Sequence, residues 1–336
     1  MTATQENRTA TSIGQRVLNI DWQAKTAGAA LYTGDIDLPG MLHARILRSP
    51  HPHATIRSID VSAAMAVPGV VAIVTGSELP DRTYIHHGGP MSDRRVLAQG
   101  TVRFVGEEIA GIAAKTAAAA ALALRRIDVK YKSLRAATTL REALEPNAPK
   151  IHEKGNVSAH RVFHWGAPDP LRPREVSVKG QYRFGRQTHA TMETSSIVAR
   201  WVPEAKILEI WTNTQAPFIV RKEIAHVLDL ELESIVIHEI AVGGGFGAKS
   251  KICEYEAIAA ALSIKSGRPV KLVLTREEEF TCTKSRHSFT IDLETFATRD
   301  GLLSARSAQM LVDNGAYNHS GPSVMANGMQ VIASLL

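Results

Sequence analysis

The sequence predicts a mixed α/β protein of two domains, and three observations support this fold class. The 336 residues correspond to roughly two domains of average size. Apolar residues make up 44% and charged residues 21% of the chain, which is ordinary globular composition and excludes a disordered, collagen-like or coiled-coil protein. Short apolar runs of alternating pattern, typical of strands, are interspersed with longer helical patterns.

Composition and charge narrow the class of protein further. The net charge of +6 is spread along the chain, so we expect no nucleic-acid partner. The two cysteines, Cys253 and Cys282, exclude a disulfide framework and any four-cysteine metal or iron–sulfur site built from this chain alone. No run of about 18 apolar residues occurs, and no secretory signal is visible at the N-terminus. We therefore expect no membrane span and a cytoplasmic location.

Composition along the chain predicts four segments. Residues 1–15 are polar and are expected to be a flexible tail. Residues 16–135 are expected to form a first domain, and residues 176–336 the beginning of a second. Between them, residues 136–175 contain several prolines, which argue against continuous regular structure and predict a connecting segment.

The first domain is predicted to alternate strands with two helices. Thr116 is expected to cap an alanine-rich helix at 117–126, and a shorter helix is expected at 62–66. Residues 76–100, rich in glycine and proline, are predicted to be a loop. Period-2 alternation of apolar residues predicts a strand at 41–47, and further strands are predicted at 57–61, 70–75, 109–114 and 127–131.

The second domain is predicted to be richer in strands. A turn at 299–301 separates two runs that are expected to form a hairpin at 289–298 and 303–312. Thr214 or Gln215 is expected to cap a helix at 216–228, with Pro217 in its first turn. Gly267 is expected to end a helix at 253–266. Further strands are predicted at 176–184, 195–201, 207–212, 235–242 and 270–275. The apolar C-terminus predicts either a surface completed by another polypeptide or a buried final strand.

A glycine-rich run between a predicted strand and a predicted helix is the clearest chemical signal. Glycines let successive backbone N–H groups turn toward an anion, and a helix N-terminus adds its dipole. Four glycines exceed what a tight turn needs, so we favour anion or cofactor binding over a ligand-free turn. The run comprises Gly243, Gly244, Gly245, Phe246, Gly247, Ala248 and Lys249.

Two nucleotide-binding alternatives can be weighed for this run. It is not a P-loop, because Lys249 follows Ala248 where Gly-Lys-Ser/Thr is required. Gly243, Gly245 and Ala248 do fit the loose dinucleotide pattern G-x-G-x-x-A, and Arg276 would then be placed to meet a 2′-phosphate. An NADP-dependent dehydrogenase is therefore an alternative. A doubly wound fold, however, needs more strand–helix units than this chain predicts.

The remaining polar motifs favour structural roles over chemistry. His189 and Glu193 have the spacing of a base and its orienter, but a strand end bonded to backbone is favoured. The charged residues at 276–279, with Arg286 and His287, are predicted to form a solvated face. Histidines at 51, 53, 86 and 87 lack a nearby carboxylate or cysteine and are expected to be surface or structural residues.

Taken together, these motifs resemble the N-terminal half of the molybdenum-binding subunit of the xanthine dehydrogenase / aldehyde oxidase family, the molybdenum hydroxylases. The first domain is similar to the family's α/β hammerhead domain. From about residue 176 the chain is similar to the first part of the molybdopterin-binding domain. The motifs of the first domain lie at 37–44, 48–51, 68–70 and 105–107. Those of the second lie at 187–193, 214–215, 243–249, 276–278, 286–287 and 313–317.

The resemblance implies a cofactor and a reaction. Gln215 would donate a hydrogen bond to an oxo ligand of molybdenum, and the Phe246 backbone would lie near that ligand. The pterin would hold the metal, so neither residue would ligate it directly. The implied cofactor is molybdenum-molybdopterin, in its cytosine dinucleotide form. The implied reaction hydroxylates an N-heteroaromatic or aldehyde substrate with water-derived oxygen. Gly243, Gly244, Gly245, Gly247 and Ala248 complete the implied cofactor-binding set.

Departures from the family define what this chain is expected to lack. Family subunits are much longer, and their general-base glutamate lies in the half that is absent here. The resemblance therefore implies no catalytic residue in this chain and no activity alone. The expected partners are a second half, as in split-subunit nicotinate dehydrogenase-type enzymes, an iron–sulfur subunit with [2Fe–2S] clusters, and an FAD subunit. A truncated, non-catalytic docking remnant is the alternative.

Two positions bear on the substrate. Ser250 stands where purine-oxidising members of the family carry a glutamate, and Asn327 stands where they carry an arginine. Both residues are expected to line the substrate pocket. Because neither provides a charge, the resemblance argues against xanthine as the small-molecule substrate.

Overall fold

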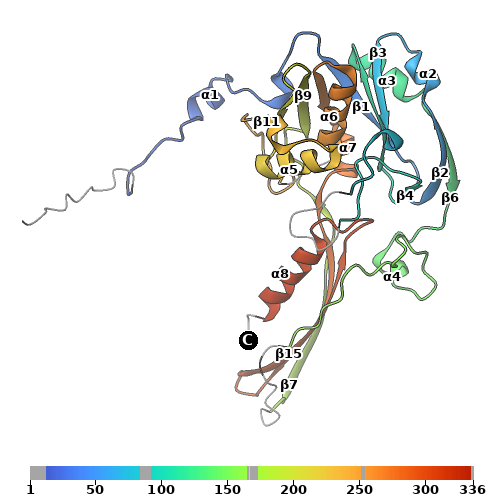
Figure 1. The fold of residues 1–336 in the computed structure, drawn as a ribbon. Helices are drawn as coiled ribbons and strands as arrows, with labels where there is room; N and C mark the ends of the chain where they lie inside the picture. Colours follow the sequence, from blue (N-terminus) through green and yellow to red (C-terminus); the bar gives the residue numbers. More distant parts are fainter. Residues whose placement is uncertain (1–12, 84–91, 165, 167–172, 251–253, 334–336) are drawn as a thin grey trace, which may run out of the picture.

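The computed structural model describes residues 13–83, 92–164, 166, 173–250 and 254–333. It consists of a body built on a seven-stranded sheet and of a long arm that extends from it (Figure 1). The predicted mixed α/β class is confirmed. Most of the predicted tail, residues 1–12, lies outside the described residues.

The body sheet has the strand order β11-β10-β9-β12-β1-β5-β3. The pairs β1–β12 and β10–β11 are parallel, and the other neighbours are antiparallel. Strands that are early and late in the sequence therefore share one continuous sheet. The division into two domains between residues 135 and 176 remains a prediction. The strands are β1 (Leu42–Arg48), β3 (Val70–Thr75), β5 (Glu108–Ala114), β9 (Ser196–Val202), β10 (Ile207–Thr212), β11 (Ile235–His238) and β12 (Val270–Val273).

Helices cover both faces of the body sheet. On one face, α6 (Glu254–Ser266) packs into the main apolar core, and α5 (Pro217–Leu228) lies beside it. On the other face, α2 (Ser62–Met65) and α3 (Ala117–Leu124) pack with Ile112 into a smaller core. The packing under α6 is tight, because a Cβ on Gly111 of β5 would lie 2.4 Å from Ile258 Cγ2.

The predicted strand–helix–strand unit is present, but its two strands belong to different sheets. Thr116 caps α3 as predicted, since its hydroxyl accepts a hydrogen bond from the Ala119 N–H at 3.1 Å. β5 lies in the body sheet, whereas the strand after α3 lies in a three-stranded sheet of order β4-β2-β6. That sheet contains β2 (Ala54–Asp60), β4 (Thr101–Val102) and β6 (Asp128–Ser133).

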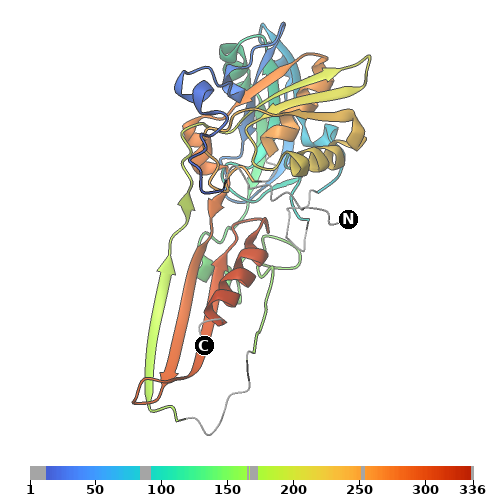
Figure 2. The ribbon, with the colours of Figure 1, turned by 90° about the vertical axis from the view of Figure 1, so that its left-hand side faces the viewer.

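The arm is a three-stranded antiparallel sheet with an apolar and a polar face. β14 (Ser288–Ala297) and β15 (Leu303–Asp313) form the predicted hairpin, and β7 (Val176–Phe184) pairs with β14. On the polar face, Gln181 Nε2 donates to Asp292 Oδ1 at 2.7 Å. Figure 2 shows α8 (Gly321–Ala333) running along the arm.

The C-terminal helix corrects one prediction. The chain ends its described part in α8, not in a buried strand. A Cβ on Gly328 would lie 3.3 Å from Met310 Cε of β15, so α8 packs against the apolar face of the arm. The sequence 321–333 contains glycine and proline, which obscured the helical pattern.

Smaller elements account for the other differences. The strand predicted at 235–242 ends at His238, and Ala216, without a side-chain hydrogen bond, caps α5 in place of Thr214 or Gln215. Among the described residues, no helix is both long and apolar enough to cross a bilayer. Short elements that the sequence did not predict are α1 (Trp22–Thr26), α4 (Leu140–Ala143), α7 (Arg276–Thr281), β8 (Gln187–Thr188) and β13 (Ser285–Arg286).

A buried charge network connects the body to α6 and α7. Arg94 NH2 lies 2.7 Å from Glu108 Oε2, and Arg48 NH1 lies 2.6 Å from Glu108 Oε1. Arg48 Nε also lies 3.0 Å from Glu278 Oε1. Arg94 Nε lies 2.9 Å from Glu254 Oε1 at the start of α6, but neither of these two atoms has hydrogen-bond geometry. Arg94 therefore links a loop, β5 and the start of α6.

The Glu254 carboxyl predicts a pH dependence of stability. Burial raises its pKa to about 7, against the opposite effects of a backbone N–H, Lys284 and Arg48. The folded state then holds a proton that the unfolded chain, with a pKa near 4.5, releases. Stability from this group is full below about pH 4.5 and is lost as the pH rises through about 7, by about 3 kcal/mol in all.

Replacing this group by an amide tests that assignment. As the pH rises from 5 to 8, the free energy of unfolding of Glu254→Gln should increase relative to that of the unsubstituted chain. Urea unfolding of both proteins at pH 5 and pH 8 measures this change. The pH dependence that comes from all other groups is the same in the two proteins and cancels. Equal changes in the free energy of unfolding would show that Glu254 is already ionised at pH 5.

Candidate functional site

The glycine-rich loop, defined here as residues 243–249, follows β11 and precedes α6. The described residues of α6 begin at Glu254, and residues 251–253 lie outside the described part. The glycines therefore lie before the described part of the helix, and the contribution of its dipole to binding stays a prediction. Any anion bound by the loop must be held by its own N–H groups and by nearby side chains.

The presence of each glycine in the loop is explained by a close contact or by the backbone conformation. A Cβ on Gly243 would lie 2.5 Å from Glu193 Cβ, and a Cβ on Gly245 would lie 2.3 Å from Gln215 Cδ. Gly244 and Gly247 have φ values of +96° and +90°, which side-chain-bearing residues rarely adopt. The four glycines therefore do not exceed the needs of this turn, and that prediction is wrong. Evidence for binding must come from the exposed groups of the loop.

Exposed polar groups of the loop do fit an anionic or oxo-bearing ligand. Gln215 Oε1 accepts a hydrogen bond from the Gly247 N–H at 3.1 Å, which leaves the side-chain NH₂ as a donor. Within the part of the chain that the structure describes, the N–H groups of Gly244, Gly245 and Phe246 have no hydrogen-bond acceptor. Left-handed residues in such a loop are typical of backbone concavities that bind anions.

Phe246 is the strained residue of the loop. Its φ is +49°, and its side chain is 77% exposed. A bulky residue in the left-handed region costs about 1–2 kcal/mol and persists where the surroundings determine the backbone. Ala248, by contrast, is buried, and its N–H donates to the Gly245 carbonyl at 2.8 Å, so its methyl group is accommodated.

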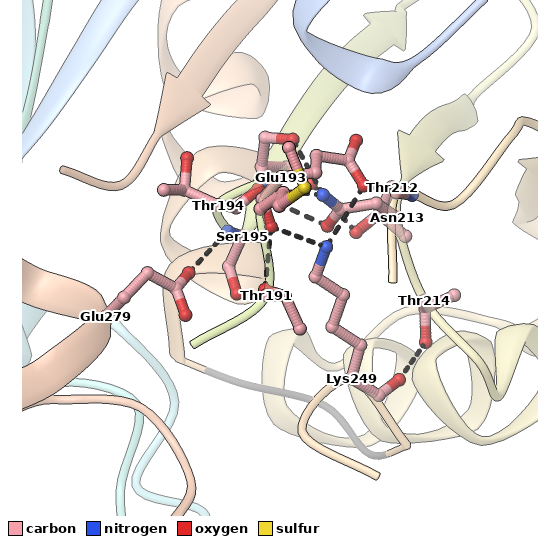
Figure 3. A network of polar contacts seen from close by, with 12 residues as sticks. Thr191, Glu193, Thr194, Ser195, Thr212, Asn213, Thr214, Lys249 and Glu279 are labelled. Carbon is pink, nitrogen blue, oxygen red and sulfur yellow. Dashed lines mark hydrogen bonds and ion pairs between the residues drawn. The ribbon is translucent and has the colours of Figure 1, made fainter. Parts of the chain in front are cut away.

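An ion pair between Glu193 and Lys249 anchors the loop (Figure 3). Lys249 Nζ donates to the Glu193 carbonyl at 2.9 Å and to Glu193 Oε2 at 3.0 Å. The same Oε2 accepts from the Gly243 N–H at 2.7 Å. The favoured strand-end interpretation of Glu193 missed this long-range contact. The only signal for this contact in the sequence is that the motifs 187–193 and 243–249 end in residues of opposite charge.

His189 lies beside the loop without contacting Glu193. Its Nε2 is 3.9 Å from the position that a Cβ on Gly247 would occupy. Glu193 is engaged by Lys249 and Gly243, and no hydrogen bond joins it to His189 among the described residues. The alternative of a base and its orienter therefore has no support in the geometry.

The charged run at 276–279 is only partly a solvated face: Arg276 and Glu277 are exposed, as predicted, whereas Glu279 is buried. These residues form α7, whose Arg276 donates to the carbonyls of Thr191 and Met192 at 2.7 and 2.9 Å. Glu279 is buried and accepts a hydrogen bond from the Ser195 N–H (Figure 3). The segment that carries Glu193 is thus fixed by α7. Arg276 is also engaged by the backbone and is not placed for a 2′-phosphate.

The two expected substrate-pocket residues lie on different elements. Ser250 follows the loop, and its hydroxyl donates to the Gly247 carbonyl at 2.8 Å. Asn327 is exposed on α8. No contact between them occurs in the described part of the chain. A cavity of about 700 Å³ lies between residues 137–163, β15 and α8, but neither of the two residues lines it.

The histidine pairs are consistent with structural roles where the structure describes them. His53 Nδ1 lies 2.9 Å from the Arg135 carbonyl oxygen, and the ring of His51 packs edge-on against Tyr131. His86 and His87 lie outside the described residues. The described residues contain no cluster of three or more histidine, cysteine or carboxylate side chains suited to a metal ion.

Comparison with known proteins defines the class of this chain. Residues 151–335 match the molybdopterin cofactor-binding domain, and residues 27–135 match the aldehyde oxidase and xanthine dehydrogenase a/b hammerhead domain. The loop, Gln215 and Lys249 all lie within the first of these matches. The fold and these matches therefore place the chain among proteins with a molybdopterin cofactor-binding domain.

The chain belongs to the xanthine dehydrogenase / aldehyde oxidase family and matches the part of its molybdopterin-binding subunit that contains the hammerhead and cofactor-binding domains. It is 36% identical over 308 residues to a probable xanthine dehydrogenase subunit of Bacillus subtilis, covering 91% of this chain and 40% of that protein. It is 34% identical over 316 residues to the nicotinate dehydrogenase large molybdopterin subunit of Eubacterium barkeri, covering 93% of this chain and 73% of that protein.

The structural comparison agrees with this assignment. Quinoline 2-oxidoreductase from Pseudomonas putida 86 superimposes with a TM-score of 0.83 at 32% identity, over 90% of this chain and 39% of that one. The chain thus spans about 40% of the length of the Bacillus and Pseudomonas relatives. The relatives of this chain include subunits of multi-subunit enzymes, among them the nicotinate dehydrogenase subunit of Eubacterium barkeri.

Proposed function

We propose that this chain binds the molybdenum cofactor of a hydroxylase that acts on an N-heteroaromatic or aldehyde substrate with water-derived oxygen. The observation that carries the proposal is the loop at 243–249, with its exposed donors, inside a molybdopterin-binding domain. When bound, the cofactor supplies the redox centre at which the substrate carbon is oxidised. The Gln215 NH₂ would donate to an oxo oxygen, and the N–H groups of Gly244, Gly245 and Phe246 would provide further donors.

The chain is proposed to work with several partners. A second polypeptide would supply the remainder of the subunit and the general-base glutamate, so no catalytic residue is assigned here. Support comes from relatives that are subunits of multi-subunit enzymes and from apolar side chains exposed on β7. Further subunits would carry [2Fe–2S] clusters and FAD. The molybdenum cofactor would be in its cytosine dinucleotide form, and the complex would be located in the cytoplasm. The exposed side chains are Val178, Tyr182 and Phe184.

The substrate is proposed to be other than a purine. Ser250 and Asn327 are both uncharged and would provide no anchoring carboxylate or guanidinium. The proposal therefore leaves the choice of substrate to the pocket that the second polypeptide completes.

Gentle affinity purification of the tagged chain from its native host tests the function. We expect molybdenum, iron and flavin together with a second molybdopterin polypeptide and smaller subunits. Gly245→Ala forces Gln215 away, so we expect it to keep the partners and lose most of the molybdenum. Gly185→Ala is the matched control, because its Cβ meets open space and its φ is not positive.

Three outcomes would contradict the proposal. Equal molybdenum in the Gly245→Ala and unsubstituted complexes would remove the loop from the cofactor site. A lone chain without molybdenum, from cells that make other molybdenum enzymes, would favour a docking remnant. Binding of NADPH by the isolated chain would favour the dehydrogenase.

A further inference from the structure

We propose that Glu193 and Lys249 are positioning residues for the cofactor loop. Together they hold the two ends of residues 243–249 at a fixed separation, so that Gln215 and the exposed N–H groups face the cofactor in one arrangement. The inference rests on the proposed function, because it takes this loop as the cofactor-binding surface.

A single carboxylate connects both ends of the loop. Glu193 Oε2 lies 2.7 Å from the N–H nitrogen of Gly243, the first residue of the loop, and 3.0 Å from Nζ of Lys249, the last. Lys249 Nζ also reaches the Glu193 carbonyl. The separation of the loop ends is therefore set by two side chains and not by the loop sequence alone.

The same lysine fixes the position of Gln215. The Lys249 carbonyl accepts hydrogen bonds from the Gln215 N–H at 2.7 Å and from the Thr214 hydroxyl at 3.1 Å. Gln215 in turn accepts from the Gly247 N–H. A shift of Lys249 would therefore move the amide that the proposed function places against the cofactor.

Stability alone does not account for this pair. The Lys249 side chain is 1% exposed, and Glu193 Oε1 is buried without a hydrogen-bond partner in the described part of the chain. Buried ion pairs with unsatisfied atoms contribute little to stability, and apolar replacements are often neutral or stabilising. Such a pair is better explained by the loop geometry that it imposes.

Three variants separate positioning from stability: Lys249→Met, Glu193→Gln and the double substitution. In the purified multi-subunit complex, we measure molybdenum retained after gel filtration, thermal midpoint and hydrogen–deuterium exchange at residues 243–249. We expect both single variants to retain about tenfold less molybdenum and to exchange faster in the loop. The double variant, with no unpaired charge, should recover the thermal midpoint but not the retention.

Lys265→Met is the matched control. Lys265 also donates to a backbone carbonyl, that of Ile73, and pairs with a glutamate, Glu78, but it lies on α6 away from the loop. We expect its retention of molybdenum and its loop exchange to equal those of the unsubstituted complex.

Recovery of molybdenum retention together with the thermal midpoint in the double variant would overturn the positioning role. An unsubstituted complex that lacks molybdenum would overturn the proposed function instead. The positioning role is then judged from exchange alone, and unchanged loop exchange in Lys249→Met would overturn it.

Discussion

Replacing Arg94 by leucine is expected to lower the free energy of unfolding by about 3–5 kcal/mol, because Glu108 Oε2 and the Glu254 carboxyl then lose a buried cationic partner. Arg94 is 3% exposed and lies between Glu108 and Glu254, both equally buried. Its guanidinium also packs over the rings of Phe104 and Tyr317, with centroid distances of 5.1 and 5.4 Å. Urea unfolding of the full chain measures the loss.

The neighbouring arginine provides the control. Arg95 pairs with Asp81 at 2.6 Å, but the two side chains are 37% and 71% exposed. Exposed pairs contribute about 0–1 kcal/mol, so Arg95→Leu should change stability little. Similar losses in the two variants would mean that the buried network does not set the stability of the body.

Adding one methyl group to β5, next to the edge strand of the body sheet, is the second large effect that we expect. In Gly111→Ala the new Cβ would meet Ile258 Cγ2 at 2.4 Å and Leu262 Cδ1 at 3.2 Å. Overpacking of this kind costs about 1–3 kcal/mol. Thermal unfolding of the chain would show a lower midpoint, because α6 must move away from the body sheet.

A double-mutant cycle identifies the cause of that loss. Ile258→Ala removes the methyl group that the new Cβ would meet, at a cost of about 2–5 kcal/mol on its own. We expect the double variant to be more stable than the sum of the single losses predicts. Gly34→Ala, which meets open space, should be nearly neutral. Strict additivity would show that Gly111 is not limited by Ile258.

Local patterns predicted the elements of the fold well, because their causes are local. The bounds 70–75 and 176–184 agree with β3 and β7, and Thr116 caps α3 as its side chain predicts. Alternation along a strand and capping at a helix start are decided within a few neighbouring residues. The same holds for the hairpin of β14 and β15, whose turn residues are explicit.

Contacts that join distant segments could not be predicted in this way. The charged run at 276–279 has a solvated pattern, and its structural role comes from contacts with distant residues, such as the hydrogen bond from the Ser195 N–H to Glu279 and the ion pair of Glu278 with Arg48. Likewise, nothing near Glu193 in the sequence indicates Lys249 as its partner. The candidate site was therefore predicted by its glycines and Gln215, while the residues that hold those groups in place were not.

The parallel pairing of β1 with β12 has a consequence for how the chain acquires its structure. Leu42 pairs with Val270, and Arg45 donates to the Val273 carbonyl at 3.0 Å across 228 positions of sequence. Pairing over such a separation is slow, because the loop between the two strands must close before any contact forms. During synthesis β1 keeps an open edge until residue 273 has left the ribosome. Chains interrupted before that point should aggregate, and full-length chains should depend on chaperones while the sheet is incomplete.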